Sequence, residues 1–133
     1  MSAFVLDASV AGRWLLSREP ASRLGEMRLT ALQDGVAVPA LFRFESAHML
    51  TRWARNADLD DAVAAAAELA LLPTVEDVEP AAVDALLSLA LETGLSAYDA
   101  AYLELAERLG LPLATVDGKL AAAARARGIA VIP

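Results

Sequence analysis

The chain has 133 residues, of which 57% are hydrophobic, and it carries a net charge of −7, no cysteine and a single histidine. This composition excludes a disulfide framework, a thiolate metal site and a zinc site built from several histidines of one chain. The acidic balance argues mildly against binding of nucleic acid through a broad basic face, and the abundant alanine predicts one helix-rich domain over residues 1–133.

In the N-terminal half, short apolar segments alternate with segments of helical periodicity. Pro20 suits the first turn of a helix, and Gly35 marks a turn before an apolar triplet. Phe44 and Ala47 are expected on the buried face of their helix. The predicted elements are a strand at 3–6, helices at 9–17 and 20–34, a strand at 36–38, and helices at 40–55 and 58–72.

The C-terminal half continues the alternation, and three glycines are placed to end helices. These are Gly94, Gly110 and Gly128. The predicted elements are a strand at 74–78, helices at 80–92 and 96–109, a strand at 113–116, a helix at 118–127 and a strand at 129–132.

Strands that are apolar throughout and separated by helices indicate an α/β fold, with a parallel sheet of four or five short strands covered on both faces. Ligands of such sheets bind beyond the carboxyl ends of the strands. The most apolar stretch, residues 62–72, contains Glu68 and is too short to span a bilayer. The N-terminus does not match a signal peptide. We therefore expect a soluble, cytoplasmic protein without a membrane partner.

Four acids stand out by position, and each also has a purely structural explanation. Asp7 and Asp117 directly follow predicted strands, where an aspartate often caps the next helix. Asp99 stands three residues after Ser96, a spacing typical of a capping box. Glu45 lies within a helix, where it fits a solvated side chain paired with a nearby arginine. Read one at a time, the four therefore leave structure and chemistry both open.

Their joint placement favours chemistry, because a parallel sheet gathers them at one edge. Four converging carboxylates repel one another and raise one another's pKa, and a bound cation relieves that repulsion. An all-oxygen ligand set points to Mg²⁺ or Mn²⁺. Such ions chiefly support phosphoryl chemistry, in which metal-activated water attacks the phosphorus. The sequence thus predicts a metal site at Asp7, Glu45, Asp99 and Asp117.

The chain resembles the PIN-domain ribonucleases, in particular the VapC-type toxins of toxin–antitoxin pairs. The resemblance covers nearly the whole sequence and is strongest in residues 5–9, 95–102 and 109–120. Pro39 and Glu45 match the middle motif of the family more loosely. His48 stands where family members often have asparagine, so its role is open; a polar residue satisfied by a neighbour is the usual reading.

The resemblance implies a PIN-like three-layer α/β/α fold and an endoribonuclease that cleaves RNA, such as tRNA or another structured RNA. It implies that Asp7, Glu45, Asp99 and Asp117 are the metal-site positions, with Mg²⁺ or Mn²⁺ as cofactor. Ser9 and Thr115 look like supporting hydroxyl positions. It also implies a homodimer, and a cognate antitoxin that occludes the site.

Candidate RNA contacts are Arg13, Arg43 and Lys119, the only lysine. The pairs formed by Arg13 with Trp14 and by Arg52 with Trp53 fit either RNA contacts or core aromatics beside solvated arginines.

Two alternatives to a nuclease remain. A receiver-type signalling domain also gathers acids and a lysine at the sheet edge, but it usually has two adjacent acids after the first strand, and here Ala8 follows Asp7. An interaction module that keeps the PIN fold without catalysis is the other.

Overall fold

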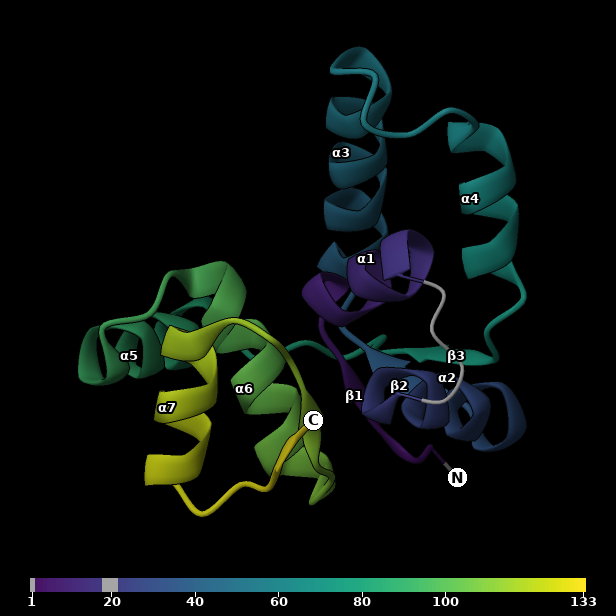
Figure 1. Ribbon diagram of the computed structural model, residues 1–133. Coiled ribbons are helices and arrows are strands. Elements are labelled where there is room, and N and C mark those ends of the chain that lie inside the picture. The colour runs from purple at the N-terminus through teal and green to yellow at the C-terminus, as the bar shows by residue number, and fades with distance from the viewer. Residues whose placement is uncertain (1, 18–21) are drawn as a thin grey trace.

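The computed structural model describes residues 2–17 and 22–133, which form a central sheet with helices on both sides (Figure 1). All five strands are parallel, in the order β3-β2-β1-β4-β5. This confirms the predicted helix-rich α/β fold. The strands are β1 (Phe4–Leu6), β2 (Val36–Val38), β3 (Thr74–Glu76), β4 (Leu113–Ala114) and β5 (Val131–Ile132).

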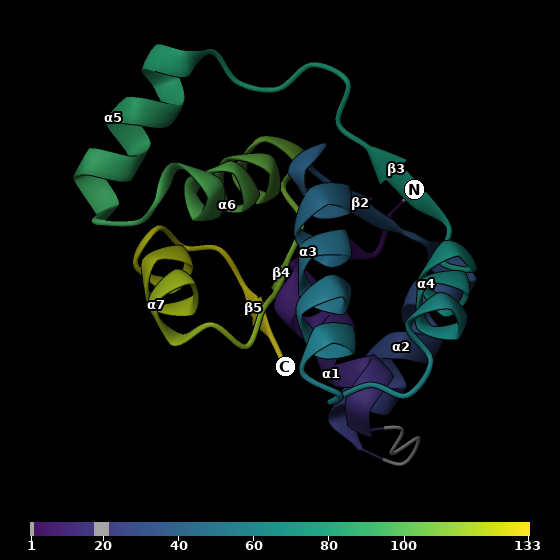
Figure 2. The ribbon, with the colours of Figure 1, turned by 90° about the horizontal axis from the view of Figure 1, so that it is seen from above.

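The helices form the outer layers. Figure 2 shows α5, α6 and α7 on one side of the sheet and α1, α2 and α4 on the other, while α3 packs beside α1 and α4. Within the described residues, no helix is long and apolar enough to cross a membrane. The helices are α1 (Ala8–Ser17), α2 (Arg23–Asp34), α3 (Leu41–Arg55), α4 (Ala62–Ala70), α5 (Val83–Thr93), α6 (Ala97–Leu109) and α7 (Gly118–Ala126).

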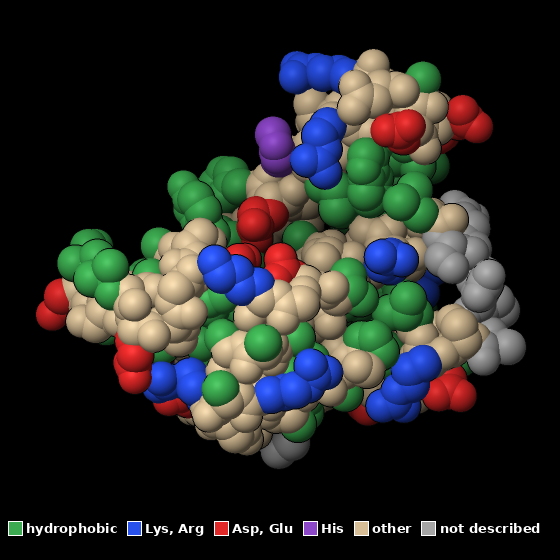
Figure 3. All heavy atoms as spheres, turned by 60° about the vertical axis from the view of Figure 1, so that its left-hand side comes forward, with side chains coloured by type: hydrophobic (Ala, Val, Ile, Leu, Met, Phe, Trp, Pro, Cys, Tyr) green, Lys and Arg blue, Asp and Glu red, His purple; other side chains and the backbone are tan. Residues whose placement is uncertain are grey.

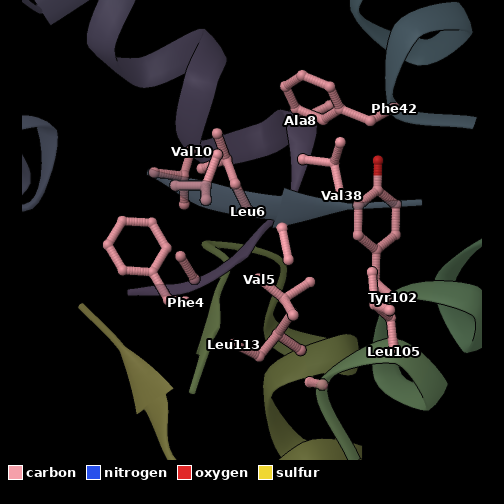
Figure 4. Close-up of a cluster of buried hydrophobic side chains, with 14 of the residues drawn as sticks. Phe4, Val5, Leu6, Ala8, Val10, Val38, Phe42, Tyr102, Leu105 and Leu113 are labelled. Carbon is pink, nitrogen blue, oxygen red and sulfur yellow. The ribbon is translucent and has the colours of Figure 1, made fainter. Parts of the chain in front are cut away.

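The core forms around the central strands because β1, β2 and β4 are buried along their whole length. Val5 and Leu6 are fully buried, and removal of each such side chain from water contributes about 1.5–3 kcal/mol. Tyr102 of α6 is also fully buried. Figure 4 shows its ring beside Val38, with the hydroxyl directed toward the end of the cluster where Phe42 lies. The hydroxyl of Tyr102 is therefore a polar group that lies at the edge of the hydrophobic core.

Helix boundaries follow local capping chemistry. Ser22 accepts a hydrogen bond from Gly25 N, so α2 begins at Arg23, and Pro20 lies outside the described residues. Asp61 caps α4 in the same way, so this helix begins at Ala62 and not at 58. The helix predicted at 80–92 also starts later, at Val83, and its end at Gly94 is confirmed by a left-handed φ of 74°.

One prediction about the core is wrong. Phe44 is 72% exposed and Ala47 is also exposed, whereas α3 buries Phe42, Ser46 and Leu50. The buried face is therefore turned by about a third of a helix turn from the expected one. This happens because Phe42 joins the main core below the helix while Leu50 packs in a second cluster with Leu15.

Candidate active site

The four acids line a single cavity of about 750 Å³. Asp7 follows β1, Glu45 lies on α3, Asp99 lies in the first turn of α6, and Asp117 precedes α7. Figure 3 shows acidic side chains gathered in a hollow, with the histidine and basic side chains above it. The remaining lining residues are Ala8, Ser9, Leu41, Phe44, His48, Met49, Arg52 and Tyr98.

Asp7 is a buried carboxylate, only 6% exposed, at the end of the central strand. Its backbone N–H continues the sheet by donating to Ala114 O. Ser9 Oγ donates to Asp7 Oδ2 at 2.8 Å, and Thr115 Oγ1 donates to the same oxygen at 2.7 Å. Both hydroxyls therefore act on one oxygen and fix the orientation of the carboxylate.

Glu45 is held by a residue that the sequence did not single out. Tyr102 donates its hydroxyl hydrogen to Glu45 Oε1 at 2.6 Å, and the Ala8 backbone N–H hydrogen-bonds the phenol oxygen. Burial and the bond to Glu45 raise the pKa of Tyr102, so the phenol stays a donor. Tyr102 stands three residues after Asp99, hence on the same face of α6, and this spacing was the available signal.

Asp99 and Asp117 occupy the capping positions expected of them. Asp117 Oδ1 accepts from Leu120 N at 2.9 Å, which makes Asp117 the N-cap of α7. Ser96 Oγ accepts from Asp99 N at 3.1 Å, so Ser96 caps α6, and its hydroxyl also hydrogen-bonds the Asp99 carboxylate. The caps at Asp117 and Ser96 are thus confirmed, whereas among the described residues the Asp99 carboxylate bonds the Ser96 hydroxyl and not its backbone N–H, so the capping box is incomplete. Both caps are compatible with a place for the two acids in the cavity.

The acids are electrostatically coupled. Burial raises the pKa of Glu45, the charges of Asp7 and Asp99 raise it further, and the Tyr102 hydrogen bond opposes them. Burial also raises the pKa of Asp99, together with the charges of Asp117 and Asp7, while the Ser96 hydroxyl and Lys119 oppose the rise. The pKa values of Glu45 and Asp99 are thus each raised by the charges of other acids, as expected for carboxylates that share one cavity.

The donor set fits a hard divalent cation that keeps part of its water shell. Within residues 2–17 and 22–133, no three Asp, Glu or His side chains lie close enough together to hold one ion among them. However, Mg²⁺ is commonly bound through one or two carboxylates plus waters. Asp7, Glu45 and Asp117 each have one oxygen held by a donor, and the other oxygen accepts no hydrogen bond from the described residues. Those second oxygens are available as ligands.

The candidate RNA contacts lie in different places. Lys119 is close enough for its charge to lower the pKa of Asp99. Arg43 Nη2 lies 3.3 Å from Glu76 Oε2, and neither Arg43 nor Arg13 lines the cavity. Arg52 does line it, two helix turns from Glu45; the sequence offered Arg52 as an RNA contact only through its pairing with Trp53. His48, one turn from Glu45, is an exposed part of the same wall.

Both tryptophans pack against hydrophobic clusters, Trp14 fully buried and Trp53 half-buried. Trp14 is 4% exposed within the main core, and Trp53 packs against the second cluster with Leu15 and Leu50. The core interpretation of the two Arg-Trp pairs is therefore the correct one for their aromatic members.

The comparisons with known proteins agree with this geometry. The sequence profile of the PIN domain matches residues 4–126. A search of curated proteins finds no significant match. Among solved structures, the crystal structure of PAE2754 from Pyrobaculum aerophilum is similar, with a TM-score of 0.73 and 25% sequence identity, over 98% of this chain and 83% of that chain. The strand order also differs from the 2-1-3-4-5 order of receiver domains, which argues against the signalling alternative.

Proposed function

Because the chain belongs to the PIN domain family, whose members are generally nucleases that use divalent metal ions, we propose that it is a Mg²⁺- or Mn²⁺-dependent endoribonuclease. We further propose that it is a VapC-type toxin of a type II toxin–antitoxin pair. The observation that supports the nuclease most directly is the cavity lined by Asp7, Glu45, Asp99 and Asp117.

In this proposal, one or two metal ions would sit on Asp7, Asp99 and Asp117, with no more than two of these carboxylates binding the same ion directly and the others binding through water. Glu45 would bind metal directly or through water. Bound Mg²⁺ or Mn²⁺ supplies water activation and offsets negative charge on the phosphodiester. The acids are arranged to leave oxygens for such an ion, since the donors on Asp7, Glu45 and Asp117 occupy one oxygen of each.

The neighbouring residues act on the acids or on the substrate. Ser9 and Thr115 orient Asp7, and Tyr102 orients Glu45. Lys119, in the first turn of α7, places a positive charge beside Asp99, where it attracts a phosphate. Ser9, Thr115 and Tyr102 thus act by positioning the acids, so the rate of RNA cleavage depends on how rigidly the fold holds these carboxylates.

The toxin role rests on the resemblance of residues 95–102 and 109–120 to VapC-type toxins and on charge. An acidic chain with carboxylates in a cavity suits a basic antitoxin segment that inserts a cationic side chain among them. A homodimer completes this proposal. Growth arrest on expression, absent for Asp99→Asn and relieved by a co-expressed antitoxin, is the expected behaviour; normal growth with active protein would contradict it.

The nuclease is tested with purified, antitoxin-free protein incubated with total RNA and Mg²⁺ or Mn²⁺, with and without chelator. Cleavage is expected only with metal, and Asp7→Asn and Asp99→Asn are expected to lose it. Cleavage that survives both substitutions would contradict the metal site. Absence of both cleavage and metal binding by calorimetry would instead favour the inactive interaction module.

A further inference from the structure

Two exposed aromatic side chains border the acidic cavity. Phe44 is 72% exposed and Tyr98 is 68% exposed, and both line the cavity. Each directly precedes an acid of the site, Glu45 on α3 and Asp99 on α6. Both rings therefore stand beside the carboxylates, on two helices that the Tyr102–Glu45 hydrogen bond joins.

Phe44 and Tyr98 differ from the other aromatic residues of this chain because they are exposed. The sequence has seven aromatic residues, all within the described part. Phe4, Trp14, Phe42 and Tyr102 are buried and Trp53 is half-buried, so Phe44 and Tyr98 are all the exposed aromatics of this protein. Exposure of a large ring to water is unfavourable. Because both exposed rings lie at one cavity, this surface is indicated to be a binding site.

Basic character extends along α3 from Phe44. His48 and Arg52 follow at intervals of four residues, so the three side chains lie on one face of the helix over about 12 Å. Among described residues, Arg52 forms no ion pair, unlike Arg43 on the same helix. A guanidinium without an ion pair, an exposed aromatic ring two helix turns away and the carboxylates of the same cavity match the phosphate, the base and the cleaved bond of a short stretch of RNA.

The combination of exposed rings and an arginine at one cavity distinguishes between the ligands that this cavity could bind. An apolar peptide segment would bury Leu41, Phe44 and Met49 but needs no aromatic face. Base-paired RNA cannot offer its bases, because they are already stacked. An unpaired nucleotide uses both features, since every base has a face that stacks on an aromatic ring and every linkage carries a phosphate for arginine.

We propose that Phe44 and Tyr98 form a base-stacking subsite for an unpaired nucleotide of single-stranded RNA, with Arg52 and His48 along the adjoining phosphates. The proposal rests on the ribonuclease function proposed above and deepens it. It assigns the rings to substrate binding, separate from the acids that follow them in sequence.

The test is binding of a fluorescein-labelled, mixed-sequence 12-nucleotide single-stranded RNA, followed by anisotropy in Ca²⁺, with the RNA checked for integrity on a gel. Phe44→Leu and Tyr98→Leu keep the apolar bulk but remove the ring, and each is expected to weaken binding roughly 5- to 150-fold. Phe44→Tyr and Tyr98→Phe keep the ring and are expected to bind within about twofold of the unmodified protein. The control Leu91→Ala alters a side chain that is 76% exposed on α5, away from the cavity, and should change nothing.

Several results would overturn the subsite. These are no binding of single-stranded RNA by the unmodified protein, equal binding by the leucine variants, equal loss in the ring-preserving variants, or equally tight binding of the duplex form. Retention of RNA binding by the leucine variants, with loss of binding to an apolar peptide, would assign the rings to a protein partner instead.

Separate readouts distinguish this proposal from the nuclease. Mn²⁺ affinity, measured by calorimetry, is expected to be unchanged in Phe44→Leu and Tyr98→Leu. A parallel fall in Mn²⁺ affinity would mean that the rings act by holding Glu45 and Asp99, which would overturn the subsite. RNA that binds through the rings but is never cleaved with Mg²⁺ or Mn²⁺ would contradict the nuclease and leave the subsite standing.

Discussion

At the scale of single residues, Tyr102 connects α6 with the acid on α3. Its ring is fully buried in the core, so the hydroxyl is held at one place and meets Glu45 Oε1 at 2.6 Å. Hydrogen bonds to an ionised acceptor are short and strong, and this one turns the second carboxylate oxygen away from the phenol. The orientation of Glu45 is therefore set from the hydrophobic core.

Replacement of Tyr102 by phenylalanine should weaken the metal site while sparing the fold. The ring keeps its packing, but the buried Ala8 N–H loses its acceptor, so the free energy of unfolding is expected to fall by about 1–3 kcal/mol. Loss of the hydrogen bond that orients a ligand is expected to cost roughly 10- to 100-fold in Mn²⁺ affinity or in cleavage rate. Calorimetry with Mn²⁺ and RNA cleavage assays measure the two effects.

Tyr98→Phe is the matched control, because it removes a hydroxyl from an exposed tyrosine of the same helix. It should leave Mn²⁺ affinity unchanged. If Tyr102→Phe also binds Mn²⁺ and cleaves RNA like the unmodified protein, Glu45 does not depend on this hydrogen bond.

At the scale of elements, the contact between α1 and α3 positions two acids relative to each other. Asp7 immediately precedes α1, and Glu45 lies on α3. The helices approach closely at Gly12, where an added Cβ would lie 2.8 Å from Met49 Sδ and 2.9 Å from Trp53 Cη2. The thioether can move, but the packed indole cannot move without disturbing the cluster formed by Leu15 and Leu50.

Gly12→Ala is therefore expected to destabilise the protein although alanine favours helix. Overpacking costs about 1–3 kcal/mol, which exceeds the gain of about 1 kcal/mol in helix propensity at most sites. Urea unfolding measures the difference. Gly118→Ala is the control, because no atom of residues 2–17 and 22–133 lies within 4 Å of its added Cβ, and it should be neutral or slightly stabilising. Equal stability of the two variants would show that the α1–α3 contact adapts freely.

At the scale of the whole molecule, charge is distributed in two kinds of cluster. The cavity acids are mutually repulsive, and burial raises the pKa of Glu45 and Asp99 above their ordinary values of 4.5 and 3.8. Elsewhere acids are paired: hydrogen bonds from Arg108 lower the pKa of Asp77, and hydrogen bonds from Arg127 lower that of Glu107. The two clusters therefore respond to pH in opposite directions.

The metal-free protein should lose stability as pH rises from about 4.5 toward neutral, because the folded state binds more protons than the unfolded chain at Glu45 and Asp99. As pH falls below the ordinary values of 4.5 for Glu107 and 3.8 for Asp77, it should lose stability again, because these ion-paired carboxylates become protonated. Saturating Mn²⁺ should remove the loss near neutral pH and add about 2.7 kcal/mol at one hundred times its dissociation constant. Thermal unfolding from pH 3 to 8, with chelator or Mn²⁺, measures both effects.

A melting temperature that is independent of Mn²⁺ at pH 7.5 would contradict this account. Asp99→Asn provides the control, since removal of one charge should flatten the metal-free profile above pH 4.5.

Much of the fold could be predicted from the sequence alone. Buried strands that are apolar throughout indicated a parallel sheet, and the glycines at 94 and 110 ended their helices with left-handed φ angles. The positions of Asp7 and Asp117 after central strands placed them at one edge, because parallel strands end on the same side. These features are local or follow from periodicity, and short-range sterics and hydrogen bonding determine them.

Other features required the tertiary structure. Phe42 is buried and Phe44 is exposed, although helical periodicity allowed either, because the packing of α3 against the sheet and α1 selects its buried face. The partner of Glu45 lies 57 residues away in the sequence, and that of Arg43 lies 33 residues away. Neither contact can therefore be inferred from the spacing of neighbouring residues along the chain. The sequence by itself determined which acids meet at the sheet edge, while only the packing of the helices decided which oxygens are held, which rings remain exposed, and which arginine borders the cavity.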